Sequence, residues 1–120
     1  MPPTDHEADI IRIRHMLDFA RKAVAFNKGK SRSDLDRNEM LAIATVHLIE
    51  VIGEASRTVS DSFQSQHPEI PWQPISGTRN RLAHGYIDVD LDVIWTIVTQ
   101  DLPPLIKQLR RILKQETNNF

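Results

Sequence analysis

Apolar residues recur at every third or fourth position along most of this chain, and that spacing is the strongest constraint on its fold. It follows the 3.6-residue turn of an α-helix, so each run of apolar side chains falls on one helical face. Three such stripes are present: Ile10, Ile13, Leu17, Ala20 and Val24; Leu41, Ala44, Leu48, Ile52, Ala55 and Val59; and Leu91, Trp95, Val98, Leu102, Leu105, Leu109 and Ile112. No segment shows the strict alternation of a half-buried strand, so the sequence predicts an all-α fold.

Capping and helix-breaking residues predict where the long helices begin and end. The run TDHE, at Thr4 to Glu7, and the run SDLD, at Ser33 to Asp36, both have the form of a capping box, which opens a helix. We expect the first helix to end at the breaker Gly29 and the second to fade near QHPEIPWQP. Asp90 is expected to cap a later helix, which carries the third stripe.

Two prolines, Pro103 and Pro104, fall inside the register of that last stripe. Because proline lacks an amide hydrogen and its ring clashes with the preceding turn, the helix must either kink there or restart. We expect a restart, with Asp101 as the new cap and both prolines in the first turn. The chain should then form an antiparallel bundle of four or five helices.

Composition limits the organisation and the location of the chain. With 120 residues and 40% hydrophobic content, residues 1–120 should form one domain. The absence of cysteine excludes a disulfide framework and a thiolate metal site. No apolar run is long enough to span a membrane, and the N-terminus lacks a signal peptide's apolar core, so we expect a cytoplasmic protein. The formal net charge of −1 provides no general attraction for nucleic acid, so any RNA chemistry must rest on a local cluster.

A shorter helix is predicted between the second and third stripes. Pro74 suits the first turn of a helix, where its missing amide hydrogen is not needed. Gly85 suits the left-handed position just past a helix end. These two residues predict a helix from about Gln73 to His84.

The run RNRLAHGY, residues 79–86, places charged and polar groups on this predicted helix. Arg79 falls on its apolar side, whereas Asn80, Arg81 and His84 fall on another. A histidine in the last turn and a glycine beyond it are ordinary helix-ending features, but they do not explain Arg79. Because a buried unpaired charge is costly, Arg79 must pair with a carboxylate or face a cavity or a partner.

Two other polar clusters have an ordinary interpretation beside a functional one. His47, Glu50 and Glu54 share one helical face and could ligate a metal ion or pair with Arg79 across the bundle. The ordinary interpretation, which we favour, is a solvated face with an ion pair between Glu54 and a nearby arginine, Arg57. The basic loop from Lys28 to Arg32 could contact RNA phosphates, although such loops are usually just solvated.

The run RNRLAHGY resembles the signature of the HepT-like branch of the HEPN superfamily. That signature is an arginine, four residues, a histidine, one residue and a tyrosine, here Arg79, His84 and Tyr86. The resemblance also includes Asn80, the following run IDVDLDVIW, the run DLPPLI, and IEVIGEA at Ile49 to Ala55. It therefore covers most of the chain.

This resemblance implies a HEPN-like helical bundle that forms a homodimer, with the motif lining a cleft. It implies a metal-independent endoribonuclease without a cofactor, acting on RNA as the toxin of a toxin-antitoxin pair. The implied partner is a minimal nucleotidyltransferase antitoxin, which silences the toxin by transferring AMP to the motif tyrosine, Tyr86. Arg79 and His84 become the catalytic pair, with Asn80 and Arg81 as supporting groups.

The chemistry of RNA cleavage fits these residue types. When the substrate's own 2′-hydroxyl is the nucleophile, the protein must move protons and stabilise charge on the phosphate. Histidine can do the first and arginine the second, with Glu50 and Glu54 as candidates for supporting groups. The motif holds one histidine per chain, so a symmetric dimer would supply the second proton-transfer group. The alternative is a non-catalytic helical module whose polar cleft only holds a nucleotide or the partner enzyme.

Overall fold

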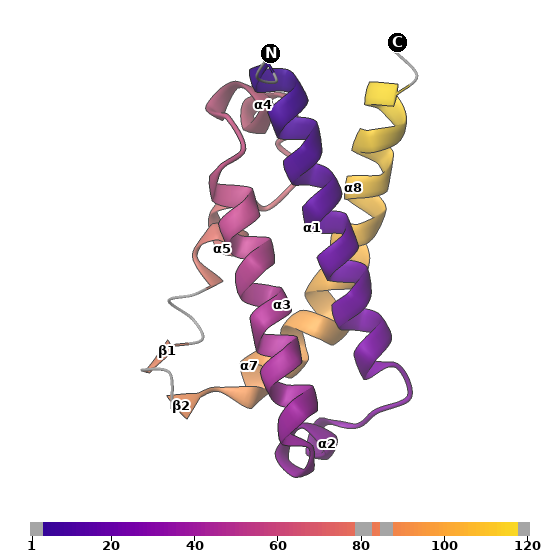
Figure 1. Ribbon diagram of the computed structural model, residues 1–120, viewed down its shortest axis with the longest axis vertical. Helices are drawn as coiled ribbons and strands as arrows, with labels where there is room; N and C mark the ends of the chain where they lie inside the picture. The colour runs from indigo at the N-terminus through magenta and orange to yellow at the C-terminus, as the bar shows by residue number, and fades with distance from the viewer. Residues whose placement is uncertain (1–3, 79–82, 85–87, 118–120) are drawn as a thin grey trace.

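Three long helices make up the body of the molecule: α1 (Asp5–Asn27), α3 (Glu39–Arg57) and α8 (Leu102–Thr117). The computed structural model describes residues 4–78, 83–84 and 88–117. In Figure 1, α1 runs down from the N-terminus and packs against both α3 and α8, which run back up on either side of it. The predicted all-α class is confirmed, because the only strands in these ranges are the two-residue β1 (Ala83–His84) and β2 (Asp88–Val89).

The first helix begins and packs as its sequence predicts. The Thr4 hydroxyl accepts a hydrogen bond from the Glu7 amide at 3.1 Å, which satisfies one of the free amides of the first turn. The centre of the predicted stripe, Ile13, Leu17 and Ala20, is buried in the core. Gly29 follows the end of α1 with a φ of +74°, a left-handed conformation that glycine adopts without a steric penalty.

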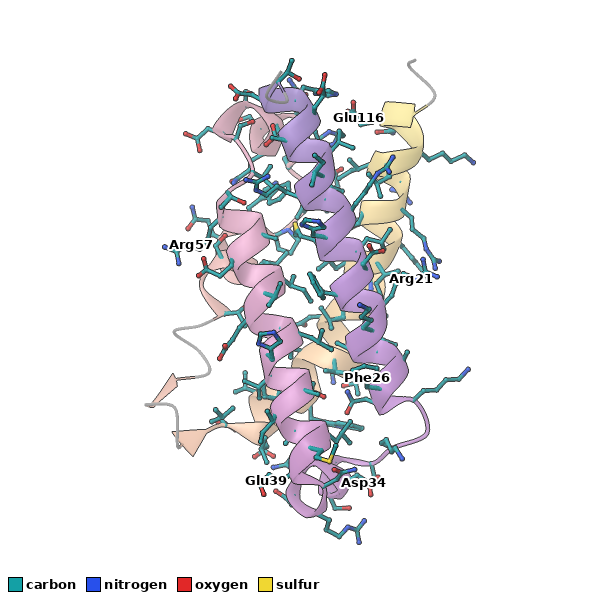
Figure 2. All side chains as sticks on the ribbon, viewed as in Figure 1. Arg21, Phe26, Asp34, Glu39, Arg57 and Glu116 are labelled. Atoms are coloured by element: carbon teal, nitrogen blue, oxygen red, sulfur yellow. The ribbon has the colours of Figure 1, made fainter. Side chains whose placement is uncertain are left out.

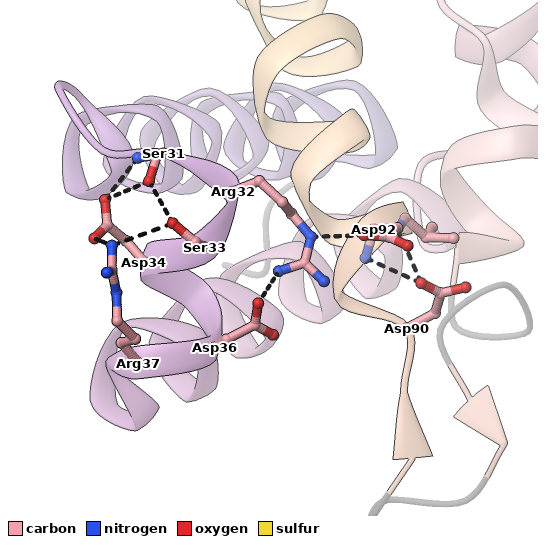
Figure 3. Close-up of polar contacts among 9 residues, drawn as sticks. Ser31, Arg32, Ser33, Asp34, Asp36, Arg37, Asp90 and Asp92 are labelled. Atoms are coloured by element: carbon pink, nitrogen blue, oxygen red, sulfur yellow. Dashed lines mark hydrogen bonds and ion pairs between the residues drawn. The ribbon is translucent and has the colours of Figure 1, made fainter.

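The predicted capping box at Ser33 to Asp36 is wrong by two residues. Ser31 caps the short helix α2 (Arg32–Arg37), and its amide donates to the Asp34 carboxylate at 2.6 Å. Ser31 and Ser33 are each followed by an aspartate three residues later, so both fit the pattern, but only Ser31 stands at the end of extended chain. Hydrogen bonds from the amide and hydroxyl of Ser31, with a smaller contribution from Arg37, lower the pKa of Asp34 (Figure 3).

The second stripe then belongs to a separate helix with its own cap. Asn38 accepts a hydrogen bond from the Leu41 amide at 3.0 Å and opens α3. Four members of the predicted stripe, Leu41, Leu48, Ile52 and Val59, are buried in the core. Val59 lies just beyond the end of α3, so the stripe is slightly longer than the helix.

A short helix that the sequence analysis did not predict, α4 (Asp61–Gln66), follows α3. Its cap is Ser60, whose hydroxyl accepts a hydrogen bond from the Phe63 amide at 3.2 Å. The buried carboxylate of Asp9 in α1 accepts from the Ser60 amide at 2.8 Å and from the Ser60 hydroxyl at 2.6 Å. The long-range partner of this cap, 51 residues away, is invisible to a local pattern.

The predicted helix from Gln73 to His84 is wrong at its C-terminal end. Helix α5 comprises Trp72–Ser76, and the Gly77 amide donates to the carbonyl of Gln73 at 2.9 Å. Pro74 lies in the first turn of α5, as predicted, whereas Ala83 and His84 form β1, which pairs antiparallel with β2. A short segment with few apolar residues does not show by its pattern whether it is a helix or a strand. Here the pairing with β2 gives residues 83 and 84 an extended backbone. The predicted helix-ending role of Gly85 lies outside the described residues.

The predicted helix restart at Asp101 is also wrong, because the backbone stays helical through both prolines. Helix α7 (Leu91–Thr96), capped by Asp90 as predicted, runs into a π-helix, η1 (Ile97–Asp101), which continues directly into α8. The two proline nitrogens cannot donate the hydrogen bonds of a regular α-helix. A wider π turn does not require those bonds, and it relieves the clash of the proline rings with the preceding turn. Asp101 therefore lies inside a continuous helical segment. In the part of the chain that the structure describes, no helix is long and apolar enough to cross a membrane.

Candidate functional site

The candidate site is defined by the two segments that border the run RNRLAHGY. Arg79, Asn80, Arg81 and Tyr86 lie outside the described residues, and for His84 the structure describes the backbone in β1. The described chain enters the run through α5 and Thr78 and leaves it through β2 and α7. Both borders lie beside one exposed face of α3.

The border before the motif is a polar hollow between α3 and α5. Its volume is about 320 Å³, and its lining residues are Glu50, Gly53, Glu54, Ser76 and Thr78. Thr78 is buried, and its hydroxyl donates to the carbonyl of Pro74 at 3.0 Å. The hydroxyls of Ser56 and Ser76 lie 2.9 Å apart and tie α3 to α5. Thr78, the residue directly before Arg79, therefore lines the same hollow as the two glutamates of α3.

Gly53 in α3 allows the backbone of α5 to approach closely. A β-carbon at this position would lie 3.1 Å from the backbone oxygen of Ile75, a tighter contact than side chains normally make. Gly53 belongs to the run IEVIGEA, which is part of the resemblance to the HepT-like family. The close approach of α5 explains why this run has a glycine at that position. It sets the position of α5 and hence of the entry to the motif.

We expect Gly53→Val to destabilise the protein. The larger side chain pushes against the backbone of α5, and such overpacking costs about 1–3 kcal/mol, more than the small gain in helix propensity. Urea unfolding measures the change in the free energy of unfolding. Gln115→Val in α8 is the control, because Gln115 is exposed and surface substitutions change stability by no more than about 0.5 kcal/mol. Equal stability of Gly53→Val and the unmodified chain would contradict this role of Gly53.

The border after the motif is a wider groove between α3 and the segment that joins β2 to α7. Its volume is about 600 Å³, and Val89 and Leu91 face His47, Glu50 and four further α3 residues across it: Glu39, Ala42, Ile43 and Val46. Asp90 fixes the start of α7 by accepting hydrogen bonds from the amides of Asp92 and Val93 at 3.0 and 3.3 Å.

A tether from α2 holds the same end of α7. Arg32 donates to Asp92 at 2.7 Å and to Asp36 at 3.1 Å, as Figure 3 shows. These carboxylates, Asp92 above all, raise the pKa of Arg32. Arg32 ends the basic loop that could contact RNA phosphates, but in the structure its side chain forms these two ion pairs.

The face of α3 that runs along both borders carries His47, Glu50 and Glu54, all exposed. Glu50 lines both the hollow and the groove, so one carboxylate links the entry and the exit of the motif. The predicted ion pair of Glu54 with Arg57 is confirmed at 3.1 Å. Within the described ranges, no group of three histidine, aspartate or glutamate side chains is arranged to hold a metal ion.

An apolar cavity that no sequence pattern predicted lies on the other side of α5. It has a volume of about 480 Å³ and lies between α3, α5, η1 and α8. Its apolar walls include Ile49, Ile52, Ile75, Leu102 and Leu105, and Thr78 also contacts it. The prolines gave the only signal for it in the sequence, because they accompany the π-helix that forms one wall.

Comparison with known proteins places the motif inside a known family. A family model described as Ribonuclease HepT-like matches residues 16–112, a range that includes the whole run RNRLAHGY. The chain belongs to the HepT-like ribonuclease family.

Several relatives share most of their length with the chain. It is 38% identical to "Probable ribonuclease HepT" of Thermococcus cleftensis over 110 residues, which cover 92% of this chain and 94% of the relative. It is 33% identical over 104 residues to a "Putative RNase" of Caldanaerobacter subterraneus subsp. tengcongensis, covering 87% of this chain and 93% of the relative. No solved structure gives a significant match.

Proposed function

We propose that this chain is an endoribonuclease toxin that cleaves RNA without a metal ion and uses Arg79 and His84 as its catalytic pair. The observation that carries the proposal is the HepT-like ribonuclease match across residues 16–112, which includes both residues. Within the motif, His84 is the group suited to proton transfer near neutral pH. Arg79 is suited to a phosphate because its planar guanidinium matches two phosphate oxygens.

The reaction follows from the substrate's own chemistry. The 2′-oxygen of the ribose bonds to the adjacent phosphorus while the bond from phosphorus to the 5′-oxygen breaks. The 2′-hydroxyl loses a proton to a general base, and the leaving 5′-oxygen gains one from a general acid, so the products are a 2′,3′-cyclic phosphate and a 5′-hydroxyl. Arg79 stabilises the extra negative charge on the phosphate in the transition state.

Glu50 and Glu54 act in this proposal as positioning residues. Both line the hollow that ends at Thr78, directly before Arg79, and Glu50 continues into the groove beside Val89. An acidic surface between the two borders of a motif with two arginines and a histidine supplies the opposite charge that those side chains require. The amide of Asn80 and the guanidinium of Arg81 complete the set of groups that hold the phosphate and orient the imidazole.

A homodimer completes the proton transfers, because the motif has one histidine per chain and the reaction needs a base and an acid. The α3 face beside the groove supports this assembly. Met40 and Ile43 are 82% and 62% exposed, and Ile43 lines the groove that contains Val89. Exposed apolar side chains next to a polar site are suited to burial against a second copy. We infer that this contact brings two motifs into one cleft.

The proposed regulator is a minimal nucleotidyltransferase antitoxin that transfers AMP to Tyr86. In that reaction the tyrosine oxygen bonds to the α-phosphorus of ATP, pyrophosphate leaves, and the hydroxyl proton is released. The attached phosphate carries negative charge into a motif with two arginines, Arg79 and Arg81. It would occupy the position that the RNA phosphate needs, so one modification blocks the site.

Metal independence is testable with purified protein and a labelled RNA. We expect cleavage to continue in the presence of a chelator. Proton transfer by His84 activates the nucleophile and the leaving group, and the guanidinium of Arg79 stabilises the phosphate charge, so no metal ion is needed for either function. The measurement is the cleavage rate with chelator, with added magnesium, and with neither. Loss of activity in chelator that a divalent ion restores would contradict the proposal and assign metal-assisted catalysis.

A further inference from the structure

We propose that the outer face of α8 is a phosphate-binding track, which holds the backbone of the RNA substrate at a distance from the cleavage motif. This inference rests on the proposed ribonuclease function. The track consists of Lys107, Arg110, Arg111 and Lys114, which we call the α8 basic stripe. All four are exposed, and they fall within roughly 100° of the helix circumference.

The fold separates this stripe from the apolar side of the same helix. Leu105, Leu109 and Ile112 are buried on the opposite face of α8. Figure 2 shows nitrogen-tipped side chains that extend outward from α8. The stripe spans about 10 Å along the helix axis, roughly the length of three phosphates of one strand in a duplex.

Charge is distributed unevenly enough to give this face a local field. The chain has 15 lysines and arginines against 16 aspartates and glutamates, yet α8 carries four basic residues and one acid, Glu116. Glu116 lies on the other side of α8 and binds His6 at 2.8 Å. Arg32, Arg37 and Arg57 form ion pairs, whereas in the described part of the chain no carboxylate lies within ion-pair distance of Lys107, Arg110 or Arg111. Lys107, Arg110 and Arg111 therefore present unneutralised positive charge.

The surroundings of the stripe favour RNA over a protein partner. The centre of a protein interface is apolar and contains few charges. Among the described residues, the large apolar side chains that are exposed belong to α1 and α3, namely Ile11, Phe26, Met40 and Ile43, and none belongs to α8. Lysine and arginine are the side chains that neutralise the phosphates of a nucleic acid backbone. The stripe has those groups and no apolar anchor.

The stripe and β1, the described part of the motif, lie on different sides of the molecule. Figure 1 shows β1 and β2 beyond α3, on the opposite side from α8. A short RNA that fills the cleavage site would not reach the stripe, whereas a long one could contact both. The stripe should therefore strengthen the binding of long RNA without affecting a trinucleotide.

The test measures binding of the full chain to 2′-O-methyl RNA, which lacks the nucleophilic hydroxyl and cannot be cleaved by the proposed reaction. Binding is therefore read independently of cleavage, and failure of the ribonuclease proposal would leave this readout intact. The test variant combines Lys107→Gln, Arg110→Gln and Arg111→Gln. The control combines Arg14→Gln, Arg21→Gln and Lys22→Gln, three exposed cations of α1, and changes the net charge equally.

We expect the test variant to lower the steepness of the plot of log affinity against log salt by about two, since each single-strand phosphate contact contributes about 0.7. Its affinity for long RNA should fall at low salt, while its affinity for the trinucleotide and its thermal unfolding stay unchanged. The control should retain the full salt dependence. Equal losses in both variants would show an effect of net charge alone and overturn the proposal. Unchanged RNA binding by the test variant would also overturn the proposal. If that variant instead loses binding to the nucleotidyltransferase while it keeps RNA binding, the stripe contacts a protein partner and the proposal is overturned.

Discussion

Replacing His84 with alanine should lower the rate of RNA cleavage by about 10²- to 10⁴-fold, the range that one positioned general acid or base contributes. The variant loses the group that transfers the proton, while the fold remains, because His84 follows α5 and lies in a two-residue strand outside the three long helices. Single-turnover cleavage of a labelled RNA measures the rate, and a thermal melt verifies folding.

The matched control is His15→Ala, which removes an exposed imidazole from α1 and should leave the rate unchanged. Arg79→Ala should reduce cleavage by about 10²- to 10³-fold, because a preorganised charge on the developing oxyanion is lost. Arg79→Lys keeps the charge but not the two-pronged geometry, so it should restore only part of the rate. A folded His84→Ala variant that cleaves RNA at the unmodified rate would contradict the assigned catalytic pair.

Tyr86→Phe should abolish silencing of the chain by the proposed nucleotidyltransferase partner. The substitution removes the only hydroxyl oxygen that a tyrosine of this chain can offer for AMP transfer, because Tyr86 is its single tyrosine. We expect the unmodified chain, co-expressed with the partner, to carry one or more AMP groups on the motif peptide in mass spectrometry. The variant should gain none and should remain toxic and active.

The control for Tyr86→Phe is the same variant expressed without the partner, which should cleave RNA as fast as the unmodified chain. AMP found on another residue would contradict the role of Tyr86. So would a Tyr86→Phe variant that the partner still silences, because inhibition would then come from binding alone.

The long helices could be predicted because their signals are local. The Thr4 cap, the stripe through Ile13 and Leu17, and the Asp90 cap each act within a few residues of sequence, and each is present in the structure. The contact between Asp9 and the Ser60 cap of α4 could not be predicted in this way. Asp9 is distant in the sequence and becomes a neighbour of Ser60 only when α1 packs against the end of α3.

The errors near the motif and the prolines have specific physical causes. The predicted helix to His84 rested on Pro74 and Gly85, but pairing of β1 with β2 is a contact between segments and overrides that pattern. At Pro103 and Pro104, an α-helix would have to break, and the chain instead widens into the π-helix η1. Whether the chain kinks, restarts or widens at these prolines depends on the packing of the surrounding helices, and the residues next to the prolines do not determine that packing.

For the candidate site, sequence and structure contribute different parts. The motif residues Arg79, His84 and Tyr86 came from the pattern of the run, and their roles stay predictions. The structure adds the borders: the close approach at Gly53, and Glu50 in contact with both the hollow and the groove. Sequence could place Glu50 and Glu54 on one helical face, but not beside Thr78 and Val89, because those contacts join distant segments.

The chemical ends of the RNA fragments test the central claim most directly. Purified protein would be incubated with a defined RNA in the presence of chelator, and the fragments would be analysed by mass spectrometry, with His84→Ala as the control. Attack by the 2′-hydroxyl, assisted by Arg79 and His84, predicts fragments that end in a 2′,3′-cyclic phosphate and begin with a 5′-hydroxyl, and none with the control. Fragments with a 5′-phosphate and a 3′-hydroxyl, or no cleavage by the folded dimeric protein, would contradict the proposed mechanism.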